Sequence, residues 1–363
     1  MPIDFLYAKF LIWIFVGGLL ISKLSKRRRE TVLGNKRERW SYGAAILFLV
    51  PLVYWCAVRS QSIGDTGSYH NAFTKAPSSF SDATAYFETY SKDSWFYGLN
   101  ILIKHFIGNK PRLYFAIIAC AQLLCIGLIY RKFSRDYWLS IFLFVASTDY
   151  TAWMFNGTRQ FFAVAISFTA LPFIVKKRYI PAILIALLAS RFHRSALLLI
   201  PVIFVVQGKA WNKKSLLILL GTLIAVAFID EFTDFLDDAL RDSQYENVVS
   251  DWKSWSDDGT NVLRVMVYAV PTVMALLWRN KLLEADNALI HLCVNMSIVS
   301  TGIYIVSMFT SGIFIGRLPI YCSLYNYILL PWEIRHFFKK DSRFFITICL
   351  VLFYVAFYVY TYM

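Results

Sequence analysis

The segment Ile3–Ser22 reads IDFLYAKFLIWIFVGGLLIS, and the segment that follows it, Lys23 to Arg39, holds eight Lys or Arg residues. As a helix, an apolar block of this length crosses the roughly 30 Å of hydrocarbon in a bilayer. A cleaved signal peptide carries its basic residues before the apolar segment rather than after it. The order found here therefore predicts a retained membrane helix whose N-terminus faces outside, because Lys and Arg gather on the cytoplasmic side.

Similar apolar blocks recur along the whole chain. Of its 363 residues, 58% are hydrophobic and 17% are charged, whereas a soluble domain carries roughly 25% charged residues. In lipid, blocks of this length satisfy their backbone groups internally only as helices. We expect an all-α, polytopic transmembrane bundle of about twelve helices, forming a single integral membrane domain over residues 1–363. The expected spans are 4–22, 41–58, 113–130, 137–154, 160–175, 179–190, 195–207, 215–229, 262–278, 288–309, 313–331 and 344–362.

The connections between these spans differ in charge. Lys23 to Arg39 and five other short connections hold 23 of the 37 Lys and Arg residues. The positive-inside rule assigns them to the cytoplasm and places both termini outside. The net charge of +14 therefore reflects topology and contact with lipid headgroups, and we expect no nucleic-acid partner. Two larger loops fall outside, residues 59–112 and the acidic segment 230–261. In the first, the stretch that follows Trp95, Phe96 and Tyr97, up to Ile107, is expected to lie along the interface or to form a re-entrant lid.

Several function classes lack their sequence signals. All six cysteines lie inside apolar blocks, so neither a disulfide framework nor a metal site is indicated. The chain contains no phosphate-binding G-x-x-x-x-G-K-[ST] loop and no D-x-D pair. The cytoplasmic connections are too short for a nucleotide-binding domain. We therefore expect no cofactor, and a lipid-borne substrate handled at the outer face.

Arginines stand at the outer ends of several spans, against the positive-inside rule. An arginine inside a span costs at least about 2.5 kcal/mol, so a carboxylate, snorkelling or an anionic ligand should compensate each one. Snorkelling suffices for Arg191 and Arg264, whereas Arg317 lies within an apolar span. The segment from Asn156 to Ala163 opens the fifth expected span. On a helix, Asn156, Arg159 or Gln160, and Ala163 lie on one face, because they are spaced by three or four residues. A helix N-terminus there would favour a phosphate or diphosphate.

Two residues are candidates for a general base. His193 lies between Arg191 and Arg194, and these like charges should keep it neutral and able to accept a proton. Asp65 could pair with an arginine or deprotonate a sugar hydroxyl, but a solvated turn with a side-chain cap explains it equally well.

These motifs follow one another in an order that resembles the EpsG family of Wzy-like polysaccharide polymerases, over roughly residues 50 to 325. Arg59, Asp65, Thr66 and Tyr69 match its first outer loop, and Tyr97-Gly98-Leu99-Asn100 follows before a helix. Next come Asn156, Arg159-Gln160 and Ala163, then His193-Arg194-Ser195-Ala196, and finally Arg317 with Tyr321. One departure is Trp95-Phe96, where the family pattern has an acidic or proline-containing approach to the Tyr-Gly pair.

The resemblance implies a metal- and nucleotide-independent glycosyltransferase with a GT-C-like fold in the bacterial cytoplasmic membrane. Its substrates would be undecaprenyl-diphosphate-linked oligosaccharide repeat units, as donor and as acceptor, and its product capsule, exopolysaccharide or O-antigen. A separate chain-length regulator is a possible partner. The expected catalytic residues are Asp65, Arg159 and His193, and the expected substrate-binding residues are Arg59, Tyr69, Asn156, Gln160, Arg194, Arg317 and Tyr321.

Two other functions stay open at this point. A transporter or flippase of the same lipid-linked units would show inverted repeats with interrupted helices. A membrane O-acyltransferase would need a histidine near the bilayer midplane, for which His291 is the candidate.

Overall fold

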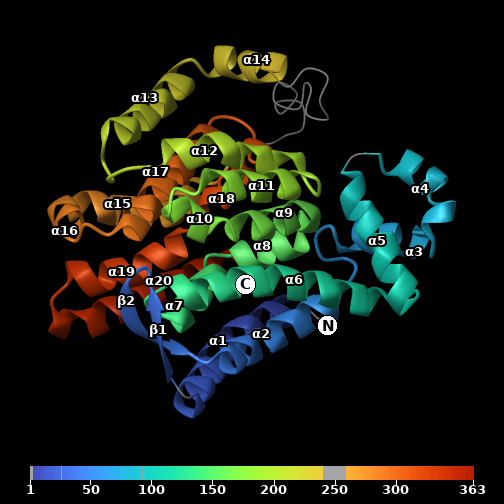
Figure 1. Cartoon of the computed structure of the whole chain (residues 1–363), viewed down its shortest axis with the longest axis horizontal. Coiled ribbons are helices and arrows are strands. Elements are labelled where there is room, and N and C mark those ends of the chain that lie inside the picture. Colours follow the sequence, from blue (N-terminus) through green and yellow to red (C-terminus); the bar gives the residue numbers. More distant parts are fainter. Residues whose placement is uncertain (1–2, 26, 92, 240–258) are drawn as a thin grey trace. The chain divides into compact units, whose positions relative to one another are not determined.

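The computed structural model describes residues 3–25, 27–91, 93–239 and 259–363 (Figure 1). Its internal contacts divide the chain into unit 1, Met1–Leu197 with Phe345–Met363, and unit 2, Leu198–Phe344. Unit 1 contains α1 (Ile3–Leu24), β1 (Arg27–Val32), β2 (Asn35–Trp40), α2 (Tyr42–Ala57), α3 (Thr66–Lys75), η1 (Phe80–Asp82), α4 (Thr84–Thr89), α5 (Ser94–Ile107), α6 (Pro111–Phe133), α7 (Tyr137–Ala146), α8 (Asp149–Phe155), α9 (Thr158–Phe168), α10 (Leu171–Val175), α11 (Tyr179–Ser190), most of η2 (Arg194–Leu198) and most of α20 (Lys340–Tyr362).

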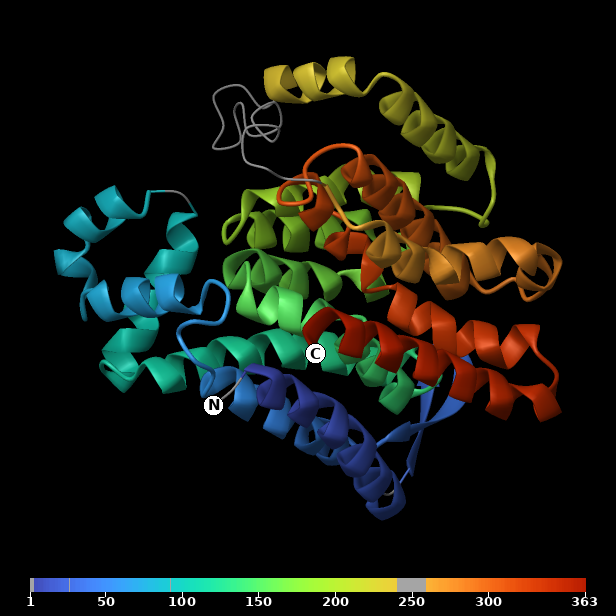
Figure 2. The same cartoon turned by 180° about the vertical axis from the view of Figure 1, so that it is seen from behind.

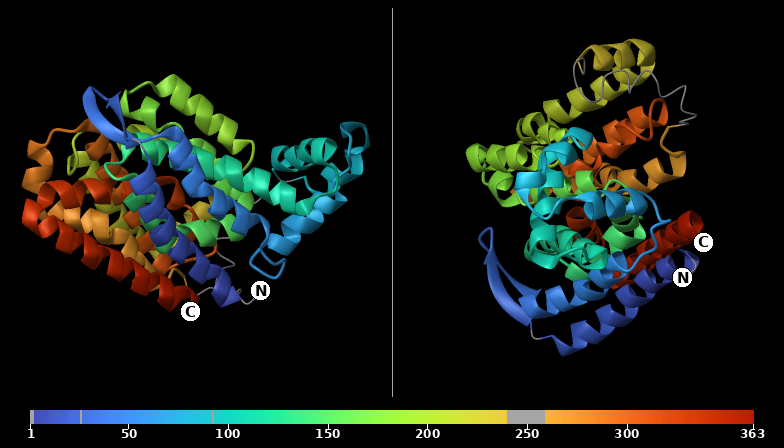
Figure 3. Two further views of the ribbon diagram at one scale, coloured as in Figure 1. Left: turned by 90° about the horizontal axis from the view of Figure 1, so that it is seen from below. Right: turned by 90° about the vertical axis from the view of Figure 1, so that its right-hand side faces the viewer.

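Helix α6 is the axis of unit 1. It packs along α2 and α9, and α1 packs against α2 and α7, as both Figure 1 and Figure 2 show. Buried aromatic side chains join these helices and also satisfy backbone carbonyls, as Tyr137 Oη does by donating to Ala45 O at 3.0 Å. The two ends of the chain lie side by side (Figure 3), where Tyr358 Oη donates to Tyr7 O at 3.1 Å.

The two ends of α6 carry different chemistry. The loop helices α3 and α5 pack against its N-terminal part, while β2 packs against the C-terminal part through Arg131. With 23 residues, α6 is about 34 Å long, close to the thickness of a bilayer core. The basic segment 23–39 and the large loop 59–112 therefore lie at opposite ends of a membrane-length helix, as their predicted topology requires.

Unit 2 is built around α17, which is buried along most of its length. Polar contacts fasten its neighbours to it, such as Thr272 Oγ1 with Ser297 Oγ at 2.7 Å, and Tyr268 stacks on Tyr304 with ring centroids 4.8 Å apart. Hydrogen bonds of this kind join helices where water is excluded. The elements of unit 2 are α12 (Leu199–Val205), α13 (Lys213–Ala227), α14 (Ile229–Ala239), α15 (Val262–Leu277), α16 (Arg279–Glu284), α17 (Ala288–Met308), η4 (Ile315–Arg317), α18 (Ile320–Ser323) and α19 (Asn326–Phe337).

The all-α prediction is confirmed, although the count of twelve spans stays a prediction. Among the described residues, five helical segments are long and apolar enough to cross a membrane, or six if the bent pair α13 and α14 forms one span. Shorter apolar helices occupy most of the other predicted spans. The expected span 137–154 breaks at Thr148, which has a φ of 77°, and the expected span 313–331 breaks into η4, α18 and the start of α19. Most of the predicted acidic loop 230–261 lies outside the described residues.

The basic segment after α1 forms a β-hairpin that the all-α prediction missed. Leu33 and Gly34 both have positive φ, as a two-residue hairpin turn requires. The hairpin is fastened to α6 by Arg131, whose side chain is buried. Arg131 donates to Trp40 O at 2.8 Å, forms an ion pair with Glu30 and stacks over the ring of Tyr42.

Glu30→Ala should lower the free energy of unfolding by about 2 to 4 kcal/mol, because it leaves the buried Arg131 charge without its carboxylate. The hydrogen bond from Arg131 lowers the pKa of Glu30 below 4.5, so its contribution is complete at neutral pH and is lost as the pH falls through that lowered pKa. The control is Glu38→Ala, which breaks an exposed pair with Arg29. Thermal unfolding in detergent measures both, and equal effects of the two variants would contradict the assignment.

Candidate active site

The first outer loop is hydrogen-bonded to the junction between α8 and α9 through Asp65. Asp65 N donates to Phe155 O at 3.0 Å, and Asp65 Oδ2 accepts from Gly157 N at 2.8 Å. Gly157 has a φ of 75° immediately before α9. Gly64, also with positive φ, packs so closely that a Cβ there would lie 1.9 Å from Asn156 Oδ1. The structure thus brings Asp65 and Asn156 together.

Arg159 is held on three sides at the start of α9. Its backbone N–H donates to Tyr69 Oη at 3.3 Å, its Nη1 donates to Tyr97 Oη at 3.1 Å, and its Nε lies 3.0 Å from Asp93 Oδ2. The Arg159 side chain is 24% exposed, whereas that of Asp93 is 1% exposed. The guanidinium group is therefore oriented by a buried carboxylate and a phenol while its edge reaches solvent.

Asp93 was missed in the sequence. It directly precedes α5 with a φ of 55°, a left-handed conformation that aspartate tolerates better than most residues. The family pattern has an acidic approach to the Tyr-Gly pair, and Asp93 supplies it two residues before Trp95. The signal was present, but the aromatic pair Trp95-Phe96 hid it.

The two phenols next to Arg159 act as neutral hydrogen-bonding groups. Burial raises the pKa of Tyr69 to about 12, although the Arg159 charge opposes the shift. Burial likewise raises the pKa of Tyr97, and Arg159 again lowers it in part. Neither phenol is a base at neutral pH, so the candidates for proton abstraction remain His193 and Asp65.

His193 connects to the same helix start through Ser195. Its Nδ1 lies 2.7 Å from Ser195 Oγ, and Gln160 Nε2 donates to that hydroxyl at 3.4 Å. His193 is 9% exposed. The structure therefore brings His193, Gln160 and Arg159 to one place in unit 1. Arg194, in contrast, is exposed.

Arg59 occupies a separate basic pocket of about 710 Å³. It is 7% exposed, donates to Thr66 Oγ1 at 2.7 Å and stacks over the rings of Phe115 and Phe155. Its Nη2 is buried without a hydrogen-bond partner in the described structure. The basic residues that line this pocket are Arg59, His70, Lys110 and Arg112.

Two predicted residues belong to unit 2. Arg317 ends the short η4 helix and is partly buried, while Tyr321 is buried in α18. Across the residues that the structure describes, no three His, Cys, Asp or Glu side chains are grouped as metal ligands.

Comparison with known proteins identifies the chain. The family model described as EpsG family matches residues 44–363. The chain belongs to the EpsG family. No curated protein and no solved structure matches it. EpsG membership implies a membrane polysaccharide polymerase-like function, of glycosyltransferase type.

In this EpsG-family protein, Asp93→Asn should lower polymer formation about 10- to 100-fold, because the Arg159 guanidinium loses its orienting charge. The measurement is the amount of polysaccharide in a strain that lacks the chromosomal copy. Asp82→Asn, an exposed change in the same loop, is the control and should leave polymer unchanged. If Asp93→Asn makes as much polymer as Asp82→Asn, the ion pair does not position Arg159 for activity.

Proposed function

We propose that the protein polymerises undecaprenyl-diphosphate-linked oligosaccharide repeat units at the outer face of the bacterial cytoplasmic membrane, without a metal or a nucleotide. The observation that carries this proposal is the oriented guanidinium of Arg159 at the N-terminus of α9, joined through Gln160 and Ser195 to His193. An oriented cation at a helix start suits a diphosphate, and a histidine nearby suits a sugar hydroxyl.

The proposed step is one substitution at the anomeric carbon of the donor sugar. The acceptor hydroxyl oxygen forms the new bond to that carbon, and its proton passes to the base. The bond to the lipid diphosphate breaks, and the diphosphate leaves with the electron pair. Each charge-assisted hydrogen bond to the diphosphate contributes about 1.5–3 kcal/mol. Bonds that strengthen as its charge develops lower the barrier selectively.

Arg159 is assigned to the donor diphosphate. Asp93 and Tyr97 hold its guanidinium before substrate arrives. The entropy of fixing the Arg159 side chain therefore does not add to the activation barrier. Arg317 is assigned to the binding of a substrate diphosphate on the strength of the family resemblance, with Tyr321 four residues further along the chain.

His193 is assigned as the base. Ser195 orients its ring through Nδ1. Asp65 is the alternative, but its Oδ2 already accepts the Gly157 N–H, which supports a positioning role. Tyr69, Asn156 and Gln160 are assigned to substrate contacts around this centre.

The Arg59 pocket is assigned to the acceptor's diphosphate, in preference to Arg194. Its volume of about 710 Å³ and its basic lining suit a diphosphate, and the buried Arg59 Nη2 needs an acceptor. Arg194 is exposed, and an exposed arginine satisfies its donors with water.

Arg159→Lys should reduce polymer at least about 100-fold although it keeps the charge, because an ammonium cannot replace the planar donors that bind Tyr97 and a diphosphate together. The matched control is Arg191→Lys, whose exposed guanidinium stacks over Trp95 and should tolerate the change. Purified protein in liposomes with lipid-linked repeat units gives the measurement. Wild type should produce a ladder of longer chains, and movement of single units across the membrane without growth would indicate a transporter instead.

The two candidate bases are separable by experiment. His193→Gln should abolish chain growth while binding of lipid-linked units stays within a few-fold of wild type, because only proton transfer is lost. Asp65→Asn should instead lower the unfolding temperature and leave residual activity, because it weakens the lock on Gly157. Growth that persists in His193→Gln and vanishes in Asp65→Asn would reverse the assignment.

A further inference from the structure

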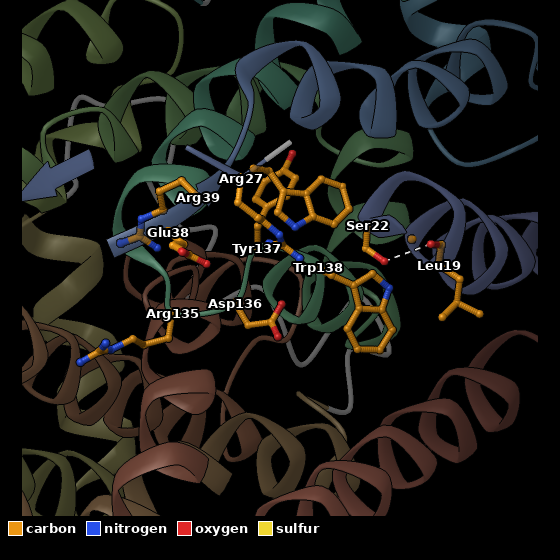
Figure 4. A pocket seen from close by; sticks show the side chains of 11 residues that line it. Leu19, Ser22, Arg27, Glu38, Arg39, Arg135, Asp136, Tyr137 and Trp138 are labelled. Atoms are coloured by element: carbon orange, nitrogen blue, oxygen red, sulfur yellow. Dashed lines mark hydrogen bonds between the residues drawn. The ribbon is translucent and has the colours of Figure 1, made fainter. Parts of the chain in front are cut away.

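A second pocket with arginines in its lining lies at the opposite end of α6 from the candidate active site. It has a volume of about 300 Å³ and lies between the hairpin, the C-terminal part of α1 and the start of α7. Figure 4 shows the hairpin residues Arg27, Glu38 and Arg39 on one side of it and Ser22 and Leu19 on the other. No residue of the proposed polymerase site contributes to it.

Arg39 is the residue that points to a ligand. It is 4% exposed, and only its Nη1 makes a hydrogen bond, to Ser134 O. Its Nε and Nη2 are buried without hydrogen-bond partners in the described structure. Burial, with the charges of Arg37 and Arg135 adding to it, lowers the pKa of Arg39 to about 10, so the group remains cationic at neutral pH. A buried cation with two unmet donors is costly unless an anion meets them.

The remaining residues of the pocket define its chemistry. Arg27, stacked on Trp40 at 5.5 Å, and Arg135 add positive charge. The two carboxylates of the pocket each have a partner, since Glu38 pairs with Arg29 and Asp136 Oδ1 accepts from Leu139 N. The anion therefore meets more arginine than carboxylate, and a phosphate group matches the fork of Arg39.

Apolar side chains beside the pocket favour a lipid as the source of the phosphate. Leu19 lines it and is 63% exposed, and Leu20 and Leu24 are 53% and 82% exposed on the same helix. This end of α1 is the C-terminal end of the segment Leu6–Leu24, which is apolar enough to cross a membrane. A phosphate in the pocket would thus sit at headgroup level, with acyl chains along α1.

We propose that this pocket binds the phosphate of a membrane phospholipid, with Arg39 as its principal ligand and Arg27 assisting. The site fastens the hairpin to the membrane surface predicted to be cytoplasmic. It is independent of the polymerase proposal, because it uses none of the same residues and its test measures phospholipid binding rather than polymer formation.

Native mass spectrometry of the detergent-purified full chain, titrated with phosphatidylglycerol, tests the proposal. Wild type should retain one phospholipid, and Arg39→Gln should weaken retention at least about tenfold. Lys36→Gln removes the same charge from an exposed position on the same strand and should retain lipid as wild type does. Because Arg39→Gln also loses the bond to Ser134, Arg27→Gln is a second variant. Arg27 is exposed, and its loss should weaken retention several-fold without affecting folding.

Diacylglycerol with the same acyl chains, and inorganic phosphate, distinguish the possible ligands. Diacylglycerol should not be retained, and equal retention of it would overturn the proposal, as would wild-type retention in both arginine variants. If inorganic phosphate raises the unfolding temperature only when Arg39 is present, and phospholipid is not retained, the phosphate site stands and its lipid source is wrong.

Discussion

The ion pair between Arg159 and Asp93 is the constraint on which the candidate site depends. A guanidinium at the end of an apolar helix is stable only if something compensates its charge, and here a carboxylate with 1% side-chain exposure does so. Since Asp93 precedes α5 and Arg159 begins α9, the pair ties the large outer loop to the helix bundle. The contacts of Asp65 with the α8–α9 junction reinforce the same join.

Buried arginines recur at both ends of α6, and the partners of each one distinguish their roles. Arg131 has every feature of a structural residue: a carboxylate, a backbone carbonyl and an aromatic ring all engage it. Arg59 and Arg39 lie in pockets and retain guanidinium nitrogens without hydrogen bonds in the described structure. A buried unmet donor costs about 1–3 kcal/mol, and this cost is the reason that both proposals place an anionic ligand beside these two arginines.

The sequence could predict features that are set by neighbouring residues, such as helices, better than contacts between residues that are far apart in the chain. Most apolar blocks predicted helical structure correctly, because an apolar composition in lipid demands internal hydrogen bonds. The break at Thr148 and the hairpin were not predictable in this way. The break rests on the positive φ of a single residue inside an apolar block, and the hairpin is held by the distant Arg131 of α6. The motifs around Asp65 and Arg159 could be found in the sequence because they stand next to helix ends, whereas the hydrogen bond of Asp65 to Gly157 is visible only in the structure. For Asp93, an acidic signal before the Tyr-Gly pair was present in the sequence, but its ion pair was not, since Arg159 lies 66 residues further along the chain.

The pairing of Arg159 also limits what it can contribute to a reaction. With Asp93 at 3.0 Å the pair is close to neutral, so it supplies directed hydrogen-bond donors more than net charge. A leaving diphosphate gains negative charge as the glycosidic bond breaks, and that charge needs a cation as well as donors. The partial positive charge of the α9 N-terminus meets part of this need. The paired guanidinium cannot supply the remainder, so the proposed mechanism needs a further cation besides Arg159.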